Sequence, residues 1–338
     1  MPAKILHIIT KSEIGGAQTW VKDQVTLLGG EFEHFIITNK AGWLTENATV
    51  KDHLFVPEIE KGFSLKAYLK IVDFIKQNRI DVVVASSANA GLYARLLKVM
   101  AKVRVIYVSH GWSCIYNGGR LRKLYITIER VLSFLSDKIL CVSEKDKQDA
   151  AKIIGIKEDK LIHIRNCVFP RKSQHKEVTS CFKVLFLGRL AHPKRPDLLI
   201  DAISQLPDVS LDVVGDGPLL SHCSRPGNVH FVGAVENFDN FSEYDLFALI
   251  SDSEGMPMSA LEAASTGLPL LLSDVGGCGE LITKNGLLVE NSSKAIFDSI
   301  LEIKADYASY KEQAERRSIE FDITNSYGLY KALYIGAE

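Results

Sequence analysis

The chain has 338 residues, of which 46% are hydrophobic and 24% are charged, and its formal net charge is −1. This length and composition predict roughly two globular domains, and no apolar run approaches the ~20 residues that a membrane-spanning helix needs. The near-neutral charge and the few aromatic residues among the basic ones disfavour a nucleic-acid-binding protein.

The N-terminal residues and the cysteines predict a cytoplasmic protein. The apolar run in residues 1–10 is too short for a signal peptide and has no cleavage site. The cysteines are scattered without a Cys-x-x-Cys pair, which favours reduced thiols over a disulfide framework or a zinc site. There are six of them: Cys114, Cys141, Cys167, Cys181, Cys223 and Cys278.

Charge is divided unevenly along the chain. Residues 1–170 hold 25 Lys and Arg against 17 Asp and Glu, a net charge of +8, whereas residues 171–338 hold 15 against 24, a net charge of −9. Two interpretations remain open: solvated helix faces, or a patch that meets anionic lipid headgroups or an anionic acceptor. The basic residues concerned are Arg95, Lys98, Lys102, Arg104, Arg120, Arg122 and Lys123.

Apolar runs and helical patterns alternate along the first half of the chain. Strands are predicted at residues 5–9, 34–38, 81–85, 104–109 and 138–143. Amphipathic helices are predicted at residues 18–28, 65–77, 91–100, 120–135 and 144–153. Such alternation predicts a parallel sheet with helices on both faces.

A second alternating series follows a polar, proline-containing linker at residues 169–180. Its strands are predicted at residues 183–187, 210–214, 245–251, 268–273 and 287–289. The sequence therefore predicts an α/β protein with two doubly wound, Rossmann-like domains facing a central cleft.

Glycines and polar residues follow several of these strands, at the edge where doubly wound sheets bind ligands. Glycines at strand ends often serve only turns, but five such sites in one chain favour a binding site. They are Gly15-Gly16, His110-Gly111-Trp112, Gly188-Arg189, Gly215-Asp216-Gly217 and Glu254-Gly255.

The most informative segment runs from Glu254 to Glu262. Gly255 permits a ligand to approach the backbone, and Pro257 suits the first position of a short helix. The free N–H groups at that helix start attract an anion, and the two carboxylates are placed to bind hydroxyl groups. Phosphate beside hydroxyl groups describes a sugar nucleotide, although a capped helix with a solvated glutamate has the same pattern.

Arg189 and Lys194 add cations in a loop before a predicted helix. An arginine fork and a lysine point charge at this spacing can hold a diphosphate. The alternative is a basic surface loop, but cations are scarce in this acidic half of the chain.

The chain resembles the retaining glycosyltransferases of family 4, which have the two-domain GT-B fold and include enzymes of bacterial surface-polysaccharide assembly. The resemblance covers nearly the whole chain. It rests on Gly15-Gly16-Ala17, Val108–Trp112, Cys141–Glu144, Ile164–Asn166, Gly188-Arg189-Leu190 with Lys194, Val214–Pro218, Glu254–Glu262, and Asp274–Gly277 with Glu280.

The resemblance implies domains at residues 1–168, completed by 323–338, and at 181–322, with the C-terminal helix packing on the first. It also implies that Arg189 and Lys194 hold the donor diphosphate, that Glu254 meets the transferred sugar, and that Glu262 meets the ribose. His110 is then catalytic beside the donor sugar. The remaining donor contacts are expected from Gly15, Gly16, Gly255, Met256, Pro257, Met258 and Ser259.

The resemblance implies transfer with retention, by front-side attack. No residue suggests itself as a nucleophile on the opposite face of the sugar. Asp252-Ser253-Glu254 superficially resembles a metal-binding signature. We expect no metal and no cofactor, because Arg189 and Lys194 supply the countercharge. The expected donor is a sugar nucleotide, with uridine diphosphate favoured.

The acceptor is less well defined by the sequence. The basic first half favours a saccharide on a membrane lipid diphosphate, which places the enzyme at the inner face of the plasma membrane. Alternatives are a small soluble acceptor, a sugar-nucleotide epimerase of similar fold, and a non-catalytic sugar-nucleotide-binding module. A dehydrogenase is disfavoured, since no Gly-x-Gly-x-x-Gly follows the first strand.

Two positions depart from the family pattern. Arg195 and Cys167 stand where glycine is usual. Arg195 either adds charge for phosphate or crowds its loop, and the sequence assigns Cys167 no role.

Overall fold

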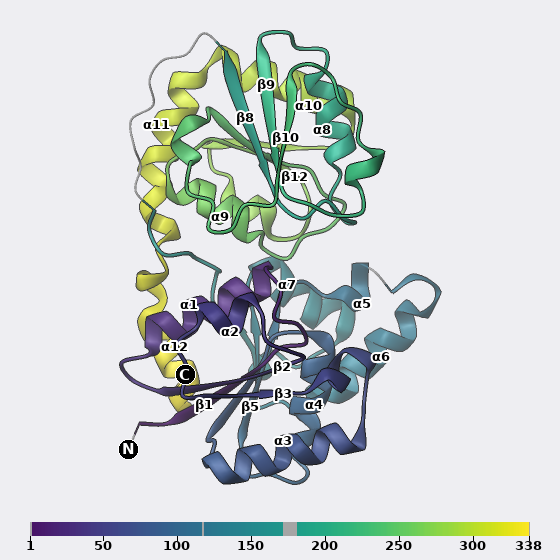
Figure 1. Ribbon diagram of the computed structural model, residues 1–338, viewed down its shortest axis with the longest axis vertical. Coiled ribbons are helices and arrows are strands. Elements are labelled where there is room, and N and C mark those ends of the chain that lie inside the picture. Colours follow the sequence, from purple (N-terminus) through teal and green to yellow (C-terminus); the bar gives the residue numbers. More distant parts are fainter. Residues whose placement is uncertain (1, 117, 172–180, 338) are drawn as a thin grey trace. The chain divides into compact units, whose positions relative to one another are not determined.

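The computed structural model describes residues 2–116, 118–171 and 181–337, which form two units (Figure 1). The first unit comprises Met1–Arg165 with Thr324–Glu338, and the second comprises Asn166–Ile323. Residues 172–180, most of the predicted linker, lie outside the described residues. Within the described ranges, no helix has the length and apolar character needed to cross a bilayer.

The sheet of the first unit has seven parallel strands in the order β3-β2-β1-β4-β5-β6-β7. The chain therefore builds outward from β1 on one side and then, from β4, on the other, which makes the sheet doubly wound. The strands are β1 Lys4–Ile8, β2 Glu33–Thr38, β3 Asp52–Phe55, β4 Val82–Ala85, β5 Arg104–Ser109, β6 Lys138–Cys141 and β7 Leu161–His163.

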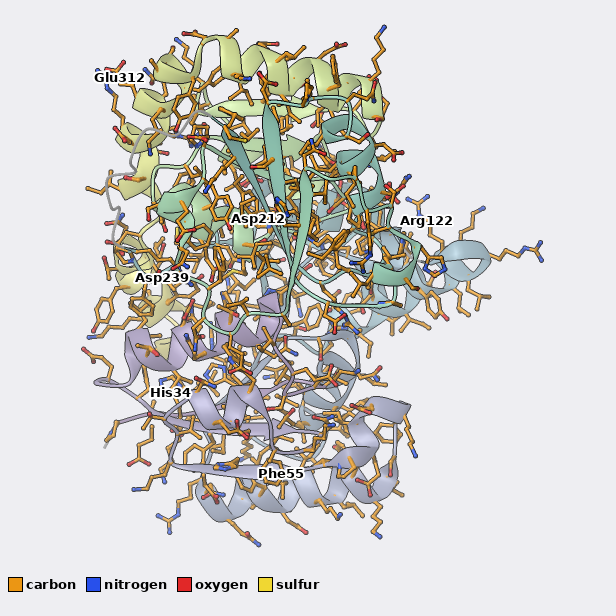
Figure 2. All side chains as sticks on the ribbon, turned by 45° about the horizontal axis from the view of Figure 1, so that its top comes forward. His34, Phe55, Arg122, Asp212, Asp239 and Glu312 are labelled. Carbon is orange, nitrogen blue, oxygen red and sulfur yellow. The ribbon has the colours of Figure 1, made fainter. Side chains whose placement is uncertain are left out.

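Helices cover both faces of this sheet (Figure 1). They are α1 Gly16–Leu28, α2 Trp43–Asn47, α3 Leu65–Asn78, α4 Ala88–Leu97, α5 Ser113–Tyr116, α6 Arg122–Ser133, α7 Glu144–Asp149 and α12 Tyr327–Ile335. Because side chains alternate along a strand, Leu6 and Ile8 join the core formed with α3 and α4, while His7 points to the other face and stacks on His34 (labelled in Figure 2).

The C-terminal helix α12 packs in the first unit against α1. Trp20 Nε1 donates to the hydroxyl of Tyr330 at 3.4 Å, and the hydroxyl of Tyr334 donates to Gln24 Oε1 at 3.1 Å. All four side chains are buried. The packing of the C-terminal helix on the first unit, which the family resemblance implies, is confirmed.

The sheet of the second unit has six parallel strands in the order β10-β9-β8-β11-β12-β13, with the same outward winding from its first strand. The strands are β8 Phe182–Leu187, β9 Val209–Val214, β10 Val229–Gly233, β11 Leu246–Leu249, β12 Leu270–Ser273 and β13 Gly286–Val289. The helices are α8 Pro196–Ile203, α9 Met258–Ser265, α10 Ser293–Ala305 and α11 Tyr307–Arg317.

Two doubly wound α/β units confirm the predicted fold class. Several boundaries differ from the prediction. The helix expected at 91–100 is α4, which starts earlier and ends at Leu97. The helix expected at 144–153 ends as α7 at Asp149 and continues as a wider π-helical turn, Ala150–Ile154, which Gly155 terminates at φ +79.

Candidate functional site

The loop that carries Arg189 rests directly on the loop that follows β9. Gly215 and Gly217 have φ angles of +145 and +153. A Cβ on Gly215 would lie 1.9 Å from the carbonyl oxygen of Gly188, and one on Gly217 would lie 2.4 Å from that of Leu190. Both positions therefore require glycine, and this close packing of two backbones fixes the start of the Arg189 loop.

Arg189 itself is exposed. Among the described residues, no carboxylate forms an ion pair with it, although its half of the chain is acidic. Its guanidinium is thus available for an anionic ligand.

Lys194 is held at the end of β11 by backbone pairing. It forms an antiparallel bridge with Ser251. On either side, Arg195 N donates to Ile250 O at 2.8 Å and Asp252 N donates to Pro193 O at 2.8 Å. The loop is therefore attached to the strand end that leads into Glu254.

The ammonium of Lys194 pairs with the carboxylate of Glu254. Their side chains are only 17% and 11% exposed, so the pair is largely shielded from water. The structure thus brings together two of the predicted site residues that are far apart in the sequence. An anion that binds beside Lys194 would compete with Glu254 for its charge.

The backbone of Glu254 packs against a glycine that the sequence did not assign to the site. Gly276 has φ +53, and a Cβ there would lie 1.7 Å from the carbonyl oxygen of Glu254. The neighbouring Gly277 donates its N–H to Gly255 O at 2.7 Å. The Asp274–Gly277 segment contributes to the family resemblance in the sequence. Only the contact in the folded chain shows that Gly276 supports Glu254.

Helix α9 begins just after Glu254 and Gly255. It starts at Met258, so Pro257 is its N-cap, with φ −71 and ψ 118, rather than the predicted first helical residue. The first helical bonds run from the N–H groups of Ala260 and Leu261 to Pro257 O. The N–H groups of Met258 and Ser259 precede them and are the ones a helix start offers to an anion.

The side chains of Met256 and Met258 are buried, at 5% and 8% exposure. Any contact that they make with a ligand therefore depends on their backbone. Ser259 is half-buried.

Glu262 pairs with an arginine that lies outside the predicted site residues. Arg171 Nη2 lies 2.9 Å from Glu262 Oε1, and its Nη1 lies 3.1 Å from Asp239 Oδ1. The guanidinium also lies over the ring of Phe241, 5.4 Å from its centroid. The predicted ribose contact is therefore oriented by Arg171 in this structure.

Arg195, one of the two departures from the family pattern, is neutralised locally. Its Nη2 lies 2.7 Å from Asp197 Oδ2 and its Nη1 lies 3.5 Å from Asp252 Oδ1. The hydrogen bonds from Arg195 lower the pKa of the Asp197 carboxyl. Asp252 also accepts from Asn291 Nδ2 at 3.0 Å. Arg195 therefore links the first turn of α8 to the segment that follows β11.

Cys167, the other departure, is buried, and its Sγ lies 3.9 Å from the carbonyl oxygen of Glu320. Its neighbour Val168 exchanges backbone hydrogen bonds with Phe321 and Ile323, both at 2.9 Å. The thiol thus lies in a packed junction of the second unit.

The remaining predicted residues, Gly15, Gly16 and His110, belong to the first unit. Gly15 is the N-cap of α1, and Gly16 is its first residue. A Cβ on Gly15 would lie 2.6 Å from Gln18 Oε1, a flexible side-chain end. The β1–α1 turn therefore places bare backbone at the carboxyl end of β1.

His110 follows β5, and its ring meets that of Trp20 edge to face at 5.4 Å between centroids. Among the described residues, its Nε2 has no hydrogen-bond partner although the atom is buried. Desolvation lowers the pKa of His110 to about 4. The imidazole is therefore neutral at physiological pH and suited to exchanging a hydrogen bond rather than to acting as a cationic acid.

The imidazole of His110 is expected to remain neutral from pH 8 to pH 5. Its pKa is depressed, so between about 6.5 and about 4 the unfolded chain binds the extra proton and the free energy of unfolding falls as pH falls. An NMR titration of the His110 ring resonance, assigned by its absence in the variant His110→Gln, measures the pKa of this imidazole. The same protein in urea, where histidine titrates at about 6.5, is the control. A midpoint near 6.5 in the folded protein would show that water reaches the ring.

Comparison with known proteins identifies two family models along the chain. Residues 14–172 match the model described as Glycosyltransferase Family 4, and residues 181–306 match the model described as Glycosyl transferases group 1. The two matches fall on either side of residues 173–180 and together cover most of the chain.

Individual relatives match over nearly the full length. The O-antigen biosynthesis glycosyltransferase WbnH of Escherichia coli is 49% identical over 333 residues, which cover 97% of this chain and 98% of WbnH. The UDP-Gal:alpha-D-GlcNAc-diphosphoundecaprenol alpha-1,3-galactosyltransferase of Escherichia coli is 25% identical, with 90% and 88% covered. The crystal structure of Anabaena Alr3699/HepE in complex with UDP-glucose shares the fold, with a TM-score of 0.82 at 18% identity over 99% and 100% of the two chains.

Proposed function

The chain belongs to glycosyltransferase family 4, and from this premise we propose that it transfers a sugar from a nucleotide diphosphate sugar to a lipid-diphosphate-linked saccharide during assembly of a surface polysaccharide, O-antigen or capsule. The observation that carries the proposal is the 49% identity, over 97% of the chain, to an O-antigen biosynthesis glycosyltransferase. The name of the 25% identical relative mentions UDP in the donor and diphosphoundecaprenol in the acceptor. This supports uridine diphosphate as the nucleotide of the donor.

The residues of the second unit are assigned to the donor. The diphosphate is held by Arg189, Lys194 and the first N–H groups of α9. Arg189 is exposed and has no carboxylate partner among the described residues, and Lys194 lies beside the end of β11. When the donor phosphate binds Lys194, the ion pair between Lys194 and Glu254 is released, and the Glu254 carboxylate accepts hydrogen bonds from hydroxyl groups of the sugar. Glu262, oriented by Arg171, meets the ribose.

The proposed reaction retains the configuration at the anomeric carbon. The bond between that carbon and the phosphate oxygen breaks, and the acceptor oxygen forms its bond on the same face. The acceptor proton passes to the departing phosphate oxygen. Arg189, Lys194 and the α9 amides stabilise the charge that grows on the leaving diphosphate, an effect worth a few kcal/mol per well-placed donor. The neutral His110 hydrogen-bonds the donor sugar.

This arrangement needs no metal ion in our proposal. The two carboxylates of the Asp252-Ser253-Glu254 segment have different basic partners, Arg195 for Asp252 and Lys194 for Glu254. The positive charge for the diphosphate comes from side chains and amides instead.

The test is incubation of the protein with a panel of labelled sugar nucleotides, each with and without a polyprenyl-diphosphate saccharide. One uridine diphosphate sugar is expected to be hydrolysed slowly alone and transferred rapidly to the lipid-linked acceptor, with the anomeric configuration retained. Interconversion of two sugar nucleotides would indicate an epimerase, and binding without turnover a non-catalytic module. Transfer to a free sugar alone would indicate a soluble acceptor.

The same assay in excess EDTA tests metal independence. The rate of transfer is expected to stay within about twofold of the rate without chelator, because Arg189 and Lys194 supply the countercharge. Loss of transfer in EDTA, with recovery on addition of Mn²⁺ or Mg²⁺, would assign Asp252 and Glu254 to a metal site.

A lipid-linked acceptor places the enzyme at the inner face of the plasma membrane as a peripheral protein. The support is the net charge of +8 on residues 1–170, which attracts anionic headgroups.

A further inference from the structure

Helix α6 in the first unit carries an unusual surface. We define the apolar stripe as Leu121, the N-cap of α6, together with Leu124, Tyr125, Ile128 and Val131 within the helix. Each of these side chains is exposed, by between 42% for Ile128 and 58% for Val131. At about 100° per residue, the four positions within the helix fall within a sector of about 120°, so they form one continuous face. Phe134, just beyond the helix, is also exposed.

The inward side of α6 combines polar side chains with Ile126, which packs partly buried against the core of the unit, whereas the inward side of a surface helix is normally apolar. Ser133 is its one buried residue. Glu129 turns inward and pairs with Arg95, which is 1% exposed, at 2.7 Å. On the same side, Arg130 Nε donates to the carbonyl oxygen of Ile154 at 2.5 Å. Polar contacts and the packing of Ile126 therefore hold the helix to its unit, while most of its apolar side chains point outward.

Basic side chains stand at the start of the stripe. Arg120, Arg122 and Lys123 are all exposed, and Figure 2 labels Arg122, at the first position of the helix. Residues 113–135 contain four basic residues and a single acidic one, Glu129, which Arg95 neutralises. The surface thus combines exposed apolar side chains with basic ones that pair with no carboxylate in the part of the chain that the structure describes.

This combination defines the occupant. Apolar side chains flanked by Arg and Lys suit the interface of an anionic bilayer, where the side chains enter the acyl boundary and the cations meet headgroup phosphates. A second copy of the chain would cover the stripe but offer no acidic residue from α6 to the basic ones. We infer that α6 is a membrane-docking helix that inserts its apolar stripe into an anionic lipid surface. The inference rests on the proposed lipid-linked acceptor and names the element that brings the enzyme to it.

Insertion predicts two separable contributions to binding. Attraction by Arg120, Arg122 and Lys123 is screened when salt rises from about 0.1 M to about 1 M, because the screening length falls from about 10 Å to about 3 Å. Burial of the stripe does not depend on screening in this way. Purely electrostatic binding would disappear at high salt, whereas docking by α6 leaves a residual fraction bound.

The experiment is sedimentation of the full-length protein with vesicles of phosphatidylglycerol and phosphatidylcholine at both salt concentrations. The variant Leu124→Glu/Ile128→Glu is expected to lose at least about tenfold in vesicle affinity at low salt, and the residual high-salt binding entirely. The triple variant Arg120→Glu/Arg122→Glu/Lys123→Glu is expected to lose the salt-dependent part. The matched control is Leu65→Glu/Leu69→Glu, an exposed pair with the same spacing on α3, which is expected to bind as the parent does.

Two control measurements show that the α6 variants are folded and bind the donor nucleotide. Neither the melting temperature nor the affinity for uridine diphosphate is expected to change in these variants. Equal sedimentation of the parent and Leu124→Glu/Ile128→Glu, or no binding by the parent, would overturn the inference. So would a parent dimer, seen by analytical ultracentrifugation, that this variant dissociates. Donor hydrolysis by the parent separates the two proposals: a protein that docks without hydrolysing any donor contradicts the proposed function alone.

Discussion

Replacement of Arg189 by alanine is expected to lower kcat by about 100- to 1,000-fold while KM for the donor changes much less. The reason is that its contribution grows as charge develops on the leaving diphosphate. Arg189 is exposed and forms no ion pair with any described carboxylate, so the substitution leaves the packing of the unit unchanged. Steady-state kinetics with the lipid-linked acceptor measure both constants.

The matched control is Arg225→Ala, which removes an arginine from the same unit, stacked over Phe231, and is expected to leave kcat unchanged. A near-normal kcat for Arg189→Ala would remove this residue from the reaction. A rise in KM at constant kcat would mean that Arg189 binds the donor and its transition state equally.

Gly276→Ala is expected to reduce kcat/KM by at least about 100-fold although Gly276 carries no side chain to contact the substrate. A methyl group there would lie 1.7 Å from the carbonyl oxygen of Glu254, in a backbone conformation of φ +53 that disfavours alanine. The Glu254–Gly255 backbone must move away, and a displacement of ~1 Å at a reacting centre costs about 100-fold. The kinetic constants and the melting temperature are the measurements.

Gly279→Ala is the matched control, because the nearest atom to a Cβ there is Leu288 Cδ1 at 3.7 Å, an ordinary contact. It is expected to behave as the parent enzyme does. If Gly276→Ala retains full activity with an unchanged melting temperature, the contact with Gly276 does not set the position of Glu254.

Most of the fold followed from the sequence because the central strands of a doubly wound sheet are buried on both faces and read as continuous apolar runs. The missed strands β3, β7 and β10 lie at the outer edges of the two sheets. In β3 and β10, most residues are exposed or half-buried. An edge strand with water on one side needs no apolar run, so its sequence resembles that of a loop.

The candidate site divides in the same way. The spacing of Arg189, Lys194, Glu254 and Glu262 was sufficient to indicate the family. The partners that hold these residues, Arg171 and Gly276, come from other segments and are revealed only when the chain is folded.

The apolar stripe of α6 has a different explanation. A helical pattern shows which residues share a face but not which way the face points. The polar anchors of α6 are a salt bridge to Arg95 in α4 and a bond to the carbonyl of Ile154. Both contacts form only in the folded chain. The sequence therefore predicted the helix and its basic residues but not that its apolar side chains point outward.

The return of α12 to the first unit has a consequence for how the protein is made. The ribosome synthesises the whole second unit before it reaches Tyr327–Ile335, the helix that covers Trp20 and Gln24. Until α12 has been synthesised, the nascent first unit therefore exposes this face of α1 to chaperones and to other nascent chains. A stop codon before residue 327 would release a polypeptide that holds every strand of both sheets and still lacks the last layer of its first unit.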